Sequence, residues 1–203
     1  MAVPWTGPEA RRRRAIDQQT YHHGNLRRAV IDAALEAIDE SGPSGWSLRE
    51  LARRAGVSHA APAHHFGDKA GVLTAIASEG FALFADALEG AGDDLLEVGV
   101  AYVRFATGHR AHFTVMFRPE LYRADDPEVS AASARARTVL RRGARARSPE
   151  GADERTAGLA AWSIAHGFAE LWLSGALSDL GDSPDAAARP VLRMLFGGGR
   201  PPA

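Results

Sequence analysis

The chain has 203 residues, of which 45% are hydrophobic, so it can bury a substantial core as one or two compact units. It contains no cysteine, which excludes disulfides and thiolate metal sites and suits a reducing cytoplasm. It has no apolar run of about 18 residues and its first residues are polar, so neither a membrane span nor a signal peptide is expected.

The formal net charge is −1, but the charges are unevenly distributed. Residues 1–30 hold six arginines against two acidic residues, whereas residues 71–203 hold 14 arginines against 17 acidic residues. A basic end on a mildly acidic body is expected where only that end meets phosphate, although a solvated basic tail would give the same pattern. We interpret residues 1–20 as a disordered basic arm, which either follows a DNA minor groove or is an unstructured leader.

A first helix is predicted from about Asn25 to Glu40, because apolar residues recur there three and four positions apart. Residues 47–66, SLRELARRAGVSHAAPAHHF, then predict two short helices joined by a tight turn. Ser47 and Glu50 have the spacing of a capping box, and Gly56 suits a left-handed turn. Ser58 is placed to cap the second helix.

The second helix is predicted to be short, roughly Ala60 to His65. With Ser58 as its cap, Pro62 would be its fourth helical residue and would remove a backbone hydrogen bond, so we expect an irregular start. A helix pair of this size and order places a helix in the DNA major groove in many proteins. The alternative is an ordinary helical hairpin within an all-α core.

The run from Tyr21 to Leu73 resembles the DNA-binding head of the TetR family of bacterial transcriptional regulators. The match covers about a quarter of the chain and is specific in combination. Its matching residues are Ser47, Arg49, Leu51, Ala52, Ala55, Gly56, Val57, Ser58, His65, Phe66, Lys69 and Leu73. The chain departs from the family pattern at Ala63, where relatives usually have an aromatic residue that packs at the end of the recognition helix and reaches DNA.

The resemblance implies a recognition helix whose small residues allow close approach to the floor of the groove. We assign base contacts to Ser58, His59, Ala60 and Ala61. We assign phosphate contacts to Ser47, Arg49, His64, His65 and Lys69. Loss of the aromatic ring at Ala63 could lower DNA affinity or shift it onto His64 and His65.

After Phe66, Asp68 can cap a longer helix that extends to about Glu89. The later segments also have helical spacing, and no convincing strand pattern is present. The further helices are predicted at about 95–108, 109–117, 128–145, 153–177 and 186–196. The segment 153–177 is apolar on almost every side, so it must be covered by its own core and by a second subunit.

Aromatic residues and a few polar groups gather in the later helices, as they do in ligand cavities, although a plain aromatic core has the same composition. The candidate ligand-pocket residues are Tyr102, Phe105, His109, Phe113, Met116, Phe117, Trp162, His166 and Trp172. We find no catalytic motif and expect no enzyme activity and no cofactor. The histidines could hold a metal, but no carboxylate spacing supports such a site, so none is expected.

The run WSIAHG, with Trp162, His166 and Gly167, resembles the C-terminal domain of a TetR-family branch named for its Trp-His-Gly signature. That resemblance implies a helical ligand-binding and dimerisation domain. We therefore expect an all-α homodimer with a head at 21–70, a body at 71–197 and a flexible tail at 198–203. Its expected function is cytoplasmic, ligand-responsive repression through a near-palindromic double-stranded DNA operator, with a small-molecule effector of unknown identity. The alternative is a helical small-molecule-binding protein whose DNA-binding head is weakened.

Overall fold

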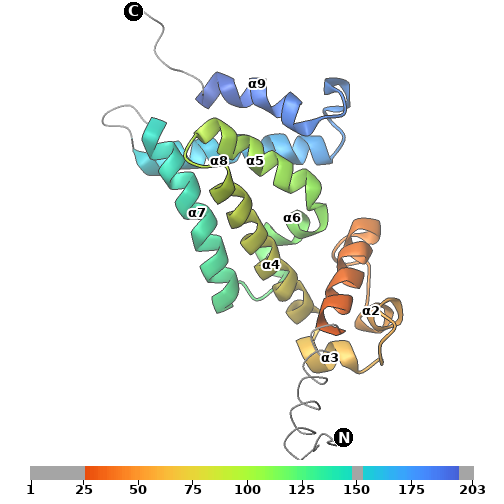
Figure 1. Ribbon diagram of the computed structural model, residues 1–203. Helices are drawn as coiled ribbons and strands as arrows, with labels where there is room; N and C mark the ends of the chain where they lie inside the picture. The colour runs from red at the N-terminus through yellow and green to blue at the C-terminus, as the bar shows by residue number, and fades with distance from the viewer. Residues whose placement is uncertain (1–25, 148–152, 197–203) are drawn as a thin grey trace, which may run out of the picture. The chain divides into compact units, whose positions relative to one another are not determined.

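The computed structural model describes residues 26–147 and 153–196, and every regular element in these ranges is a helix (Figure 1). The all-α prediction is therefore confirmed. The chain divides into two compact units, the first ending at Val72 and the second beginning at Leu73, inside the helix α4. The predicted arm at 1–20 and tail at 198–203 lie outside the described residues.

The first unit contains a helix over residues 26–41, α2 (Leu48–Arg54), α3 (Ala61–Phe66) and the first turn of α4 (Lys69–Gly90). Helix 26–41 ends at a turn in which the Gly42 amide donates to the Ile38 carbonyl at 2.8 Å. The core of this unit is apolar and contains Val30, Ile31, Ala34, Ala37, Ile38, Trp46, Leu51, Ala52, Ala61 and Val72.

The helix α3 begins within one residue of its predicted start, but its cap differs from the prediction. The helix begins at Ala61 behind the N-cap residue Ala60, and no side chain caps it, so Ser58 does not have the predicted capping role. Instead the Ser58 carbonyl accepts a hydrogen bond from the Ala61 amide at 3.0 Å. Pro62 consequently lies in the first turn, where its missing N–H would have had no helical partner. The proline thus favours this later start.

The second unit is a bundle built around α5, which packs against α6, α7, α8 and α9. Its core contains the buried residues Tyr102 and Phe105 from α5 and Phe113 from α6. Its elements after α4 are α5 (Leu95–Gly108), α6 (Arg110–Met116), the short helix η1 (Pro119–Leu121), α7 (Pro127–Arg147), α8 (Glu154–Leu173), the short helix η2 (Ser178–Leu180) and α9 (Pro184–Phe196).

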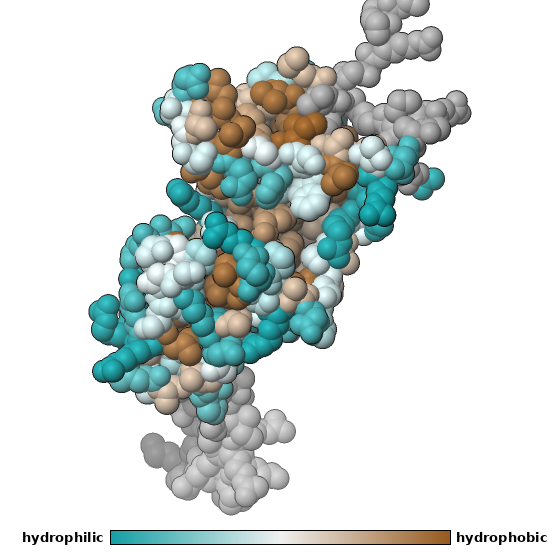
Figure 2. Space-filling view, turned by 180° about the vertical axis from the view of Figure 1, so that it is seen from behind, coloured by the Kyte–Doolittle hydropathy of each residue, from teal (hydrophilic) through white to brown (hydrophobic). Residues whose placement is uncertain are grey.

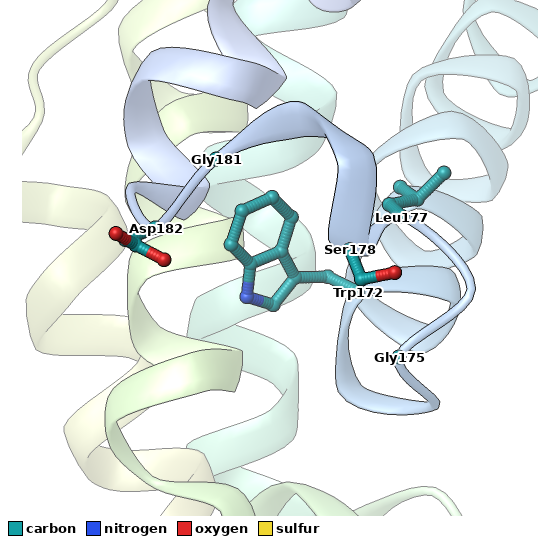
Figure 3. Close-up of a pocket in the computed structure, with 6 residues that line it drawn as sticks. All are labelled: Trp172, Gly175, Leu177, Ser178, Gly181 and Asp182. Carbon is teal, nitrogen blue, oxygen red and sulfur yellow. The ribbon is translucent and has the colours of Figure 1, made fainter.

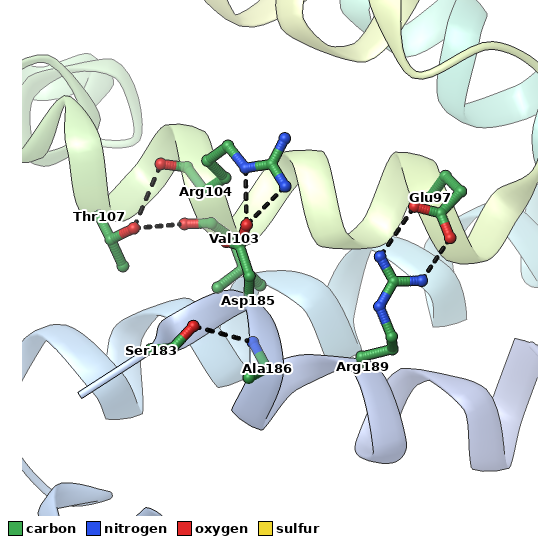
Figure 4. A network of polar contacts seen from close by, with 8 residues as sticks. All are labelled: Glu97, Val103, Arg104, Thr107, Ser183, Asp185, Ala186 and Arg189. Carbon is green, nitrogen blue, oxygen red and sulfur yellow. Dashed lines mark hydrogen bonds and ion pairs between the residues drawn. The ribbon is translucent and has the colours of Figure 1, made fainter. Parts of the chain in front are cut away.

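Two arginine–carboxylate pairs join α5 to α9 at the surface of this bundle (Figure 4). Arg104 Nε donates to Asp185 Oδ2 at 2.7 Å, and Arg189 Nη2 donates to Glu97 Oε2 at 2.9 Å. Arg189 Nη1 also donates to the second oxygen of Glu97, so that pair is bidentate. The Arg189 guanidinium lowers the pKa of Glu97 through this hydrogen bond. The pairs add polar contacts between two helices that also pack through buried apolar residues.

The helix α4 is capped as predicted, since the Gly71 amide donates to Asp68 Oδ1 at 2.8 Å. By length and composition α4 is also apolar enough to cross a bilayer, but 56% of that apolar stretch is buried inside the protein. Such burial is typical of a core helix. Buried residues of α4 include Leu73, Ile76 and Phe84.

The helix α8 ends four residues earlier than predicted. It stops at Leu173, and the Ser174 amide makes the last helical bond, to the Glu170 carbonyl at 3.0 Å. Gly175 then takes a left-handed conformation with φ +78°, which turns the chain out of the helix. The apolar pattern had continued to Leu177, but that residue belongs to the connection to α9.

Candidate functional site

The helix pair α2–α3 has the local geometry of a helix-turn-helix. Ser47 caps α2 by accepting the Glu50 amide on its hydroxyl at 3.3 Å. The Glu50 carboxylate accepts from Arg54 Nη2 at 2.7 Å, and Arg54 also donates to Glu40 at 2.8 Å. Because Glu50 binds Arg54, only the Ser47 half of the predicted capping box is found in the described residues. The Arg54–Glu40 pair joins α2 to helix 26–41, while the Arg54–Glu50 pair lies within α2.

The turn between the two helices is built as predicted. Gly56 has φ +65°, a left-handed conformation that L side chains rarely adopt. The Val57 amide donates to the Ala52 carbonyl at 2.9 Å and closes the end of α2. Both features make the chain reverse within a few residues, so that α3 packs against α2.

The four residues that we expected to contact bases do not share one environment. Ser58, His59 and Ala60 are exposed just before and at the start of α3. Ala61 is only 8% exposed and forms part of the core of the first unit. Its side chain is therefore turned away from solvent, and we exclude Ala61 from the residues proposed to contact bases.

The expected phosphate-contact residues also fall into two groups. Ser47, Arg49 and His64 are exposed, whereas His65 and Lys69 are half-buried. The rings of His64 and His65 meet edge to face with centroids 5.4 Å apart. Sequence reasoning overlooked Arg53, which is exposed in the last turn of α2, although its helical spacing could have identified it.

Lys69 has a specific set of contacts within the first unit. Its ammonium donates to the backbone carbonyls of Ser44 and Trp46, each at 3.0 Å, and lies 4.2 Å from the centre of the Trp46 ring. Burial lowers the pKa of Lys69 from its ordinary value. Sequence patterns could not have shown these contacts, because they join residues more than 20 positions apart.

In the second unit, part of the predicted ligand pocket comes together as one aromatic cluster. The His166 ring lies 4.7 Å from Phe117 and 5.3 Å from Phe113, centre to centre. Tyr102 packs against Phe113 at 6.1 Å, and Trp162 lies 6.2 Å from His166. Helices α5, α6 and α8 therefore each contribute rings to this cluster.

The polar atoms of this cluster form a chain of hydrogen bonds from Trp162 through Tyr102 to His166. Trp162 Nε1 donates to the Tyr102 hydroxyl at 3.1 Å, and Tyr102 Oη lies 2.9 Å from His166 Nδ1. Burial lowers the pKa of His166 and raises that of Tyr102, which favours neutral side chains. We therefore assign the Tyr102 proton to the bond with Nδ1 and the imidazole proton to Nε2. The Nε2–H group is the donor left for a further acceptor.

The remaining predicted pocket residues have other neighbours in the second unit. The Phe105 and His109 rings stack 4.9 Å apart, while Met116 packs beside Gly80 of α4. Trp172 stacks on Phe168 at 6.1 Å. It lines a separate open cavity of about 320 Å³ beyond the end of α8 (Figure 3). The other residues lining that cavity are Gly175, Leu177, Ser178, Gly181 and Asp182.

The described residues contain no group of three or more His, Asp or Glu side chains able to hold a metal. His112, one of the histidines considered for such a site, is buried and its Nε2 lies 3.0 Å from Glu79 Oε1. His112 thus joins α6 to α4.

Two family models match the chain over regions that correspond to these units. Residues 30–76 match the model for bacterial regulatory proteins of the TetR family, and residues 95–195 match a Tetracyclin repressor-like C-terminal domain. The chain belongs to the TetR family. The TetR-family match includes the whole helix-turn-helix, and the second match runs from the start of α5 almost to the end of α9.

The similarity of this TetR-family chain to known proteins is local in sequence and extensive in structure. It is 51% identical to the HTH-type transcriptional regulator BetI of Burkholderia thailandensis over 51 residues, 25% of this chain and 26% of that protein. The match thus spans only about a quarter of these curated relatives. A Rhodococcus sp. RHA1 protein of unknown function is 31% identical, with TM-score 0.72 and coverage of 89% of this chain and 98% of that one.

The same fold occurs in AibR, whose structure was determined in complex with isovaleryl coenzyme A and operator DNA. That structure has a TM-score of 0.64 and 20% identity, and the alignment covers 84% of this chain and 98% of AibR. At this level of identity the likeness concerns the fold.

Proposed function

We propose that this TetR-family protein is a ligand-responsive, sequence-specific DNA-binding transcriptional regulator that acts as a repressor. The observation that carries the proposal is the α2–Gly56–α3 helix-turn-helix, with Ser58, His59 and Ala60 exposed where α3 begins. Residues before and in the first turn of a recognition helix contact base edges in this class of motif. Catalysis forms no part of the proposal, and the site of action is the cytoplasm.

The proposed DNA contacts fall into two groups, those to base edges and those to phosphates. His59 and Ser58 carry donors and acceptors that can bond base edges, and Ala60 allows close approach. Ser47, Arg49 and His64 are exposed and can bind phosphate oxygens, which sets the position of the protein on DNA without reading sequence. Arg53 joins this group as a second exposed cation of α2.

The proposed assembly is a homodimer formed through α8 and α9. Large apolar side chains are exposed on both helices, among them Leu159 at 55%, Leu171 at 50% and Met194 at 86%. Apolar side chains gather in the upper part of Figure 2, where these helices lie. Exposed apolar surface of this kind marks interaction sites. A two-fold dimer would present two recognition helices to successive major grooves and would require a near-palindromic operator.

The proposed effector site is the aromatic cluster around His166. Its rings supply apolar surface, and His166 Nε2–H supplies a donor that would orient an oxygen acceptor of the ligand. The identity of the effector stays open. The helix α4 contributes residues to both units, so an effector that displaces it would alter the DNA-binding head. An effector that binds without changing operator affinity would remove this coupling.

Fluorescence anisotropy tests the proposal. The full chain is titrated into the duplex from the intergenic region beside its own gene and into a random duplex of equal length, across a salt series. We expect tight, salt-sensitive binding with clear preference for the intergenic duplex. Equal, weak binding to both duplexes would contradict regulation of that region.

A second candidate function is a helical small-molecule-binding protein with a weakened head. Ala63 favours it, because this exposed position carries a methyl group where relatives usually have an aromatic ring. An Ala63→Tyr variant separates the two functions. If the head is only weakened, the tyrosine should increase affinity for the intergenic duplex by about ten-fold, since a ring contact and a hydroxyl donor are restored. If the wild type already binds that duplex tightly, the second candidate is ruled out.

A further inference from the structure

Lys69 joins the two ends of the helix-turn-helix. Its ammonium donates at 3.0 Å to the carbonyls of Ser44 and Trp46, in the short segment that leads to the α2 cap Ser47. Lys69 itself is the first residue of α4, directly after the connection from α3. The chain therefore leaves this point at Trp46, forms both helices of the motif and returns to the same point at Lys69.

The Trp46 ring completes this contact. The ring is buried, and its Nε1 makes no hydrogen bond among the described residues. The polar group that the structure places against the ring is the Lys69 ammonium, 4.2 Å from its centre. A cation over the face of an indole is attracted by the ring quadrupole, and partial burial strengthens that attraction. Lys69 thus fixes both the backbone and the ring of Trp46.

These contacts compete with a direct role for Lys69 on DNA. A lysine ammonium has three N–H donors, and two of them are used on carbonyl oxygens. The side chain is half-buried, whereas Arg49 and Arg53 of α2 are exposed. A phosphate would find better placed cations on α2.

We propose that Lys69 is a positioning residue that closes the base of the helix-turn-helix and sets where α2 begins, instead of a phosphate contact. The inference rests on the proposed DNA-binding function for its binding readout, but the closure itself is a property of the free protein. Holding together two chain ends 23 residues apart restricts the motif entropically as well as geometrically.

The first experiment is hydrogen exchange on the full-length protein without DNA. Lys69→Met keeps an unbranched apolar side chain and removes all donors. We expect the amides of Glu50 and Leu51, which bond to Ser47, to exchange about ten-fold faster or more, because charge-assisted hydrogen bonds and the ring contact are lost. Amides of α5 should be unchanged. Arg49→Met is the matched control and should leave the Glu50 and Leu51 amides protected.

The second experiment measures DNA affinity against salt for the same variants. Lys69→Met should weaken binding to specific and random duplexes by a similar factor, while the slope of log K against log salt stays within about 0.3 of wild type. Arg49→Met should reduce that slope by about 0.9, as expected for one lost phosphate contact. A Lys69→Arg variant should also bind weakly, because the planar guanidinium can stack on the indole but does not reproduce the geometry with which the ammonium donates to both carbonyls.

Three results would each overturn the proposal: a slope reduced by about 0.9 in Lys69→Met, full binding by Lys69→Arg, or unchanged exchange at Glu50 and Leu51. If the wild type shows no DNA preference, the proposed function fails while the exchange experiment still decides the role of Lys69. Should Lys69→Met fail to fold, the exchange and binding of Lys69→Arg decide it. The two failures can thus be told apart.

Discussion

At the level of single residues, the burial of His166 affects its protonation. Its Nδ1 lies 2.9 Å from Tyr102 Oη, and its Nε2 lies 3.9 Å from a Glu170 oxygen, beyond hydrogen-bond distance. Burial is the largest cause of its lowered pKa, and the nearby Glu170 charge opposes that change. The native state therefore favours neutral imidazole, the form that can accept from Tyr102.

This lowered pKa predicts a pH dependence of stability. The stability that neutral His166 contributes is complete above the unfolded pKa of 6.5 and is lost as the pH falls through the lower, folded pKa. Between pH 7.5 and 5.5, the Tm of the wild type should fall about 2 °C or more further than that of His166→Gln. Thermal unfolding by circular dichroism measures both. Equal losses in the two proteins would place the titration elsewhere.

Variants of His59 and Arg49 should separate the recognition of base sequence from the binding of phosphate. His59→Ala should change the preferred operator sequence and cost about 1–3 kcal/mol on the cognate duplex alone. Arg49→Ala should weaken binding to all duplexes and reduce the salt slope by about 0.9. Anisotropy on a panel of single-base operator variants checks the first outcome and a salt series the second. Identical losses on specific and random DNA for both variants would contradict this division.

At the level of elements, α4 and α6 pack closely at Gly80, where α4 has no side chain. A Cβ added at Gly80 would lie 2.6 Å from Met116 Sδ and 3.1 Å from His112 Cβ. Met116 is buried, so its side chain has little room to move. Beside this contact, Glu79 lies within hydrogen-bond distance of His112. The two helices are therefore joined by close packing and by a polar pair at the same level.

Gly80→Ala should consequently destabilise the second unit by about 1–3 kcal/mol through overpacking. Gly90→Ala is the matched control in the same helix, because its added Cβ would meet nothing within 4 Å. That control should be neutral or stabilising by up to about 1 kcal/mol. Urea unfolding of both variants measures the difference. A fully stable Gly80→Ala protein would show that Met116 can rearrange.

Element positions followed from the sequence where local chemistry decides them. The predicted span of α5, Leu95–Gly108, is that of the structure, because Asp94 caps its start and accepts the Leu96 amide at 2.8 Å. The predicted Ser58 cap of α3 was wrong because two local signals conflicted: Ser58 favoured an early cap, whereas Pro62 suits the first turn. The end of α8 was wrong because an apolar pattern continued past a left-handed glycine.

The candidate sites could be predicted only in part, because burial and contacts between distant segments are not encoded in local sequence patterns. Exposure of Ser58 and His59 agrees with a turn followed by a helix, but burial of Ala61 depends on which side of α3 faces the core. The Lys69 contacts join distant segments, and no periodicity encodes them. Trp172 is an aromatic residue of the type that lines ligand pockets. It lies in the last turn of α8, however, where it stacks on Phe168 and lines a separate cavity.

At the level of the whole molecule, the proposed function requires a partner subunit, and the proposed homodimer would cover α8 and α9. Leu159 and Leu171 stand on α8 and Met194 on α9, all exposed in the single chain. Burying large apolar side chains contributes about 1.5–3 kcal/mol each, so a symmetric interface that uses them twice would be substantial.

A charge on this surface should therefore separate the subunits. Leu159→Glu combined with Met194→Glu should convert the dimer to a folded monomer and lower operator affinity by about 100-fold or more, since each head then binds its half-site alone. Sedimentation velocity gives the mass and anisotropy the affinity. Ala134→Glu, on an exposed position of α7, is the control and should remain dimeric. A double variant that stays dimeric would place the interface elsewhere.

Lys69 is the only lysine of the chain, so its side chain is also a unique position for isotopic labelling. Lysine labelled with carbon-13 at the ε-methylene would introduce one side-chain resonance at the base of the helix-turn-helix and leave all three N–H donors in place. The indole of Trp46, 4.2 Å from the nitrogen, would shift that resonance through its ring current. Free protein, operator complex and effector complex could then be compared through a single NMR signal.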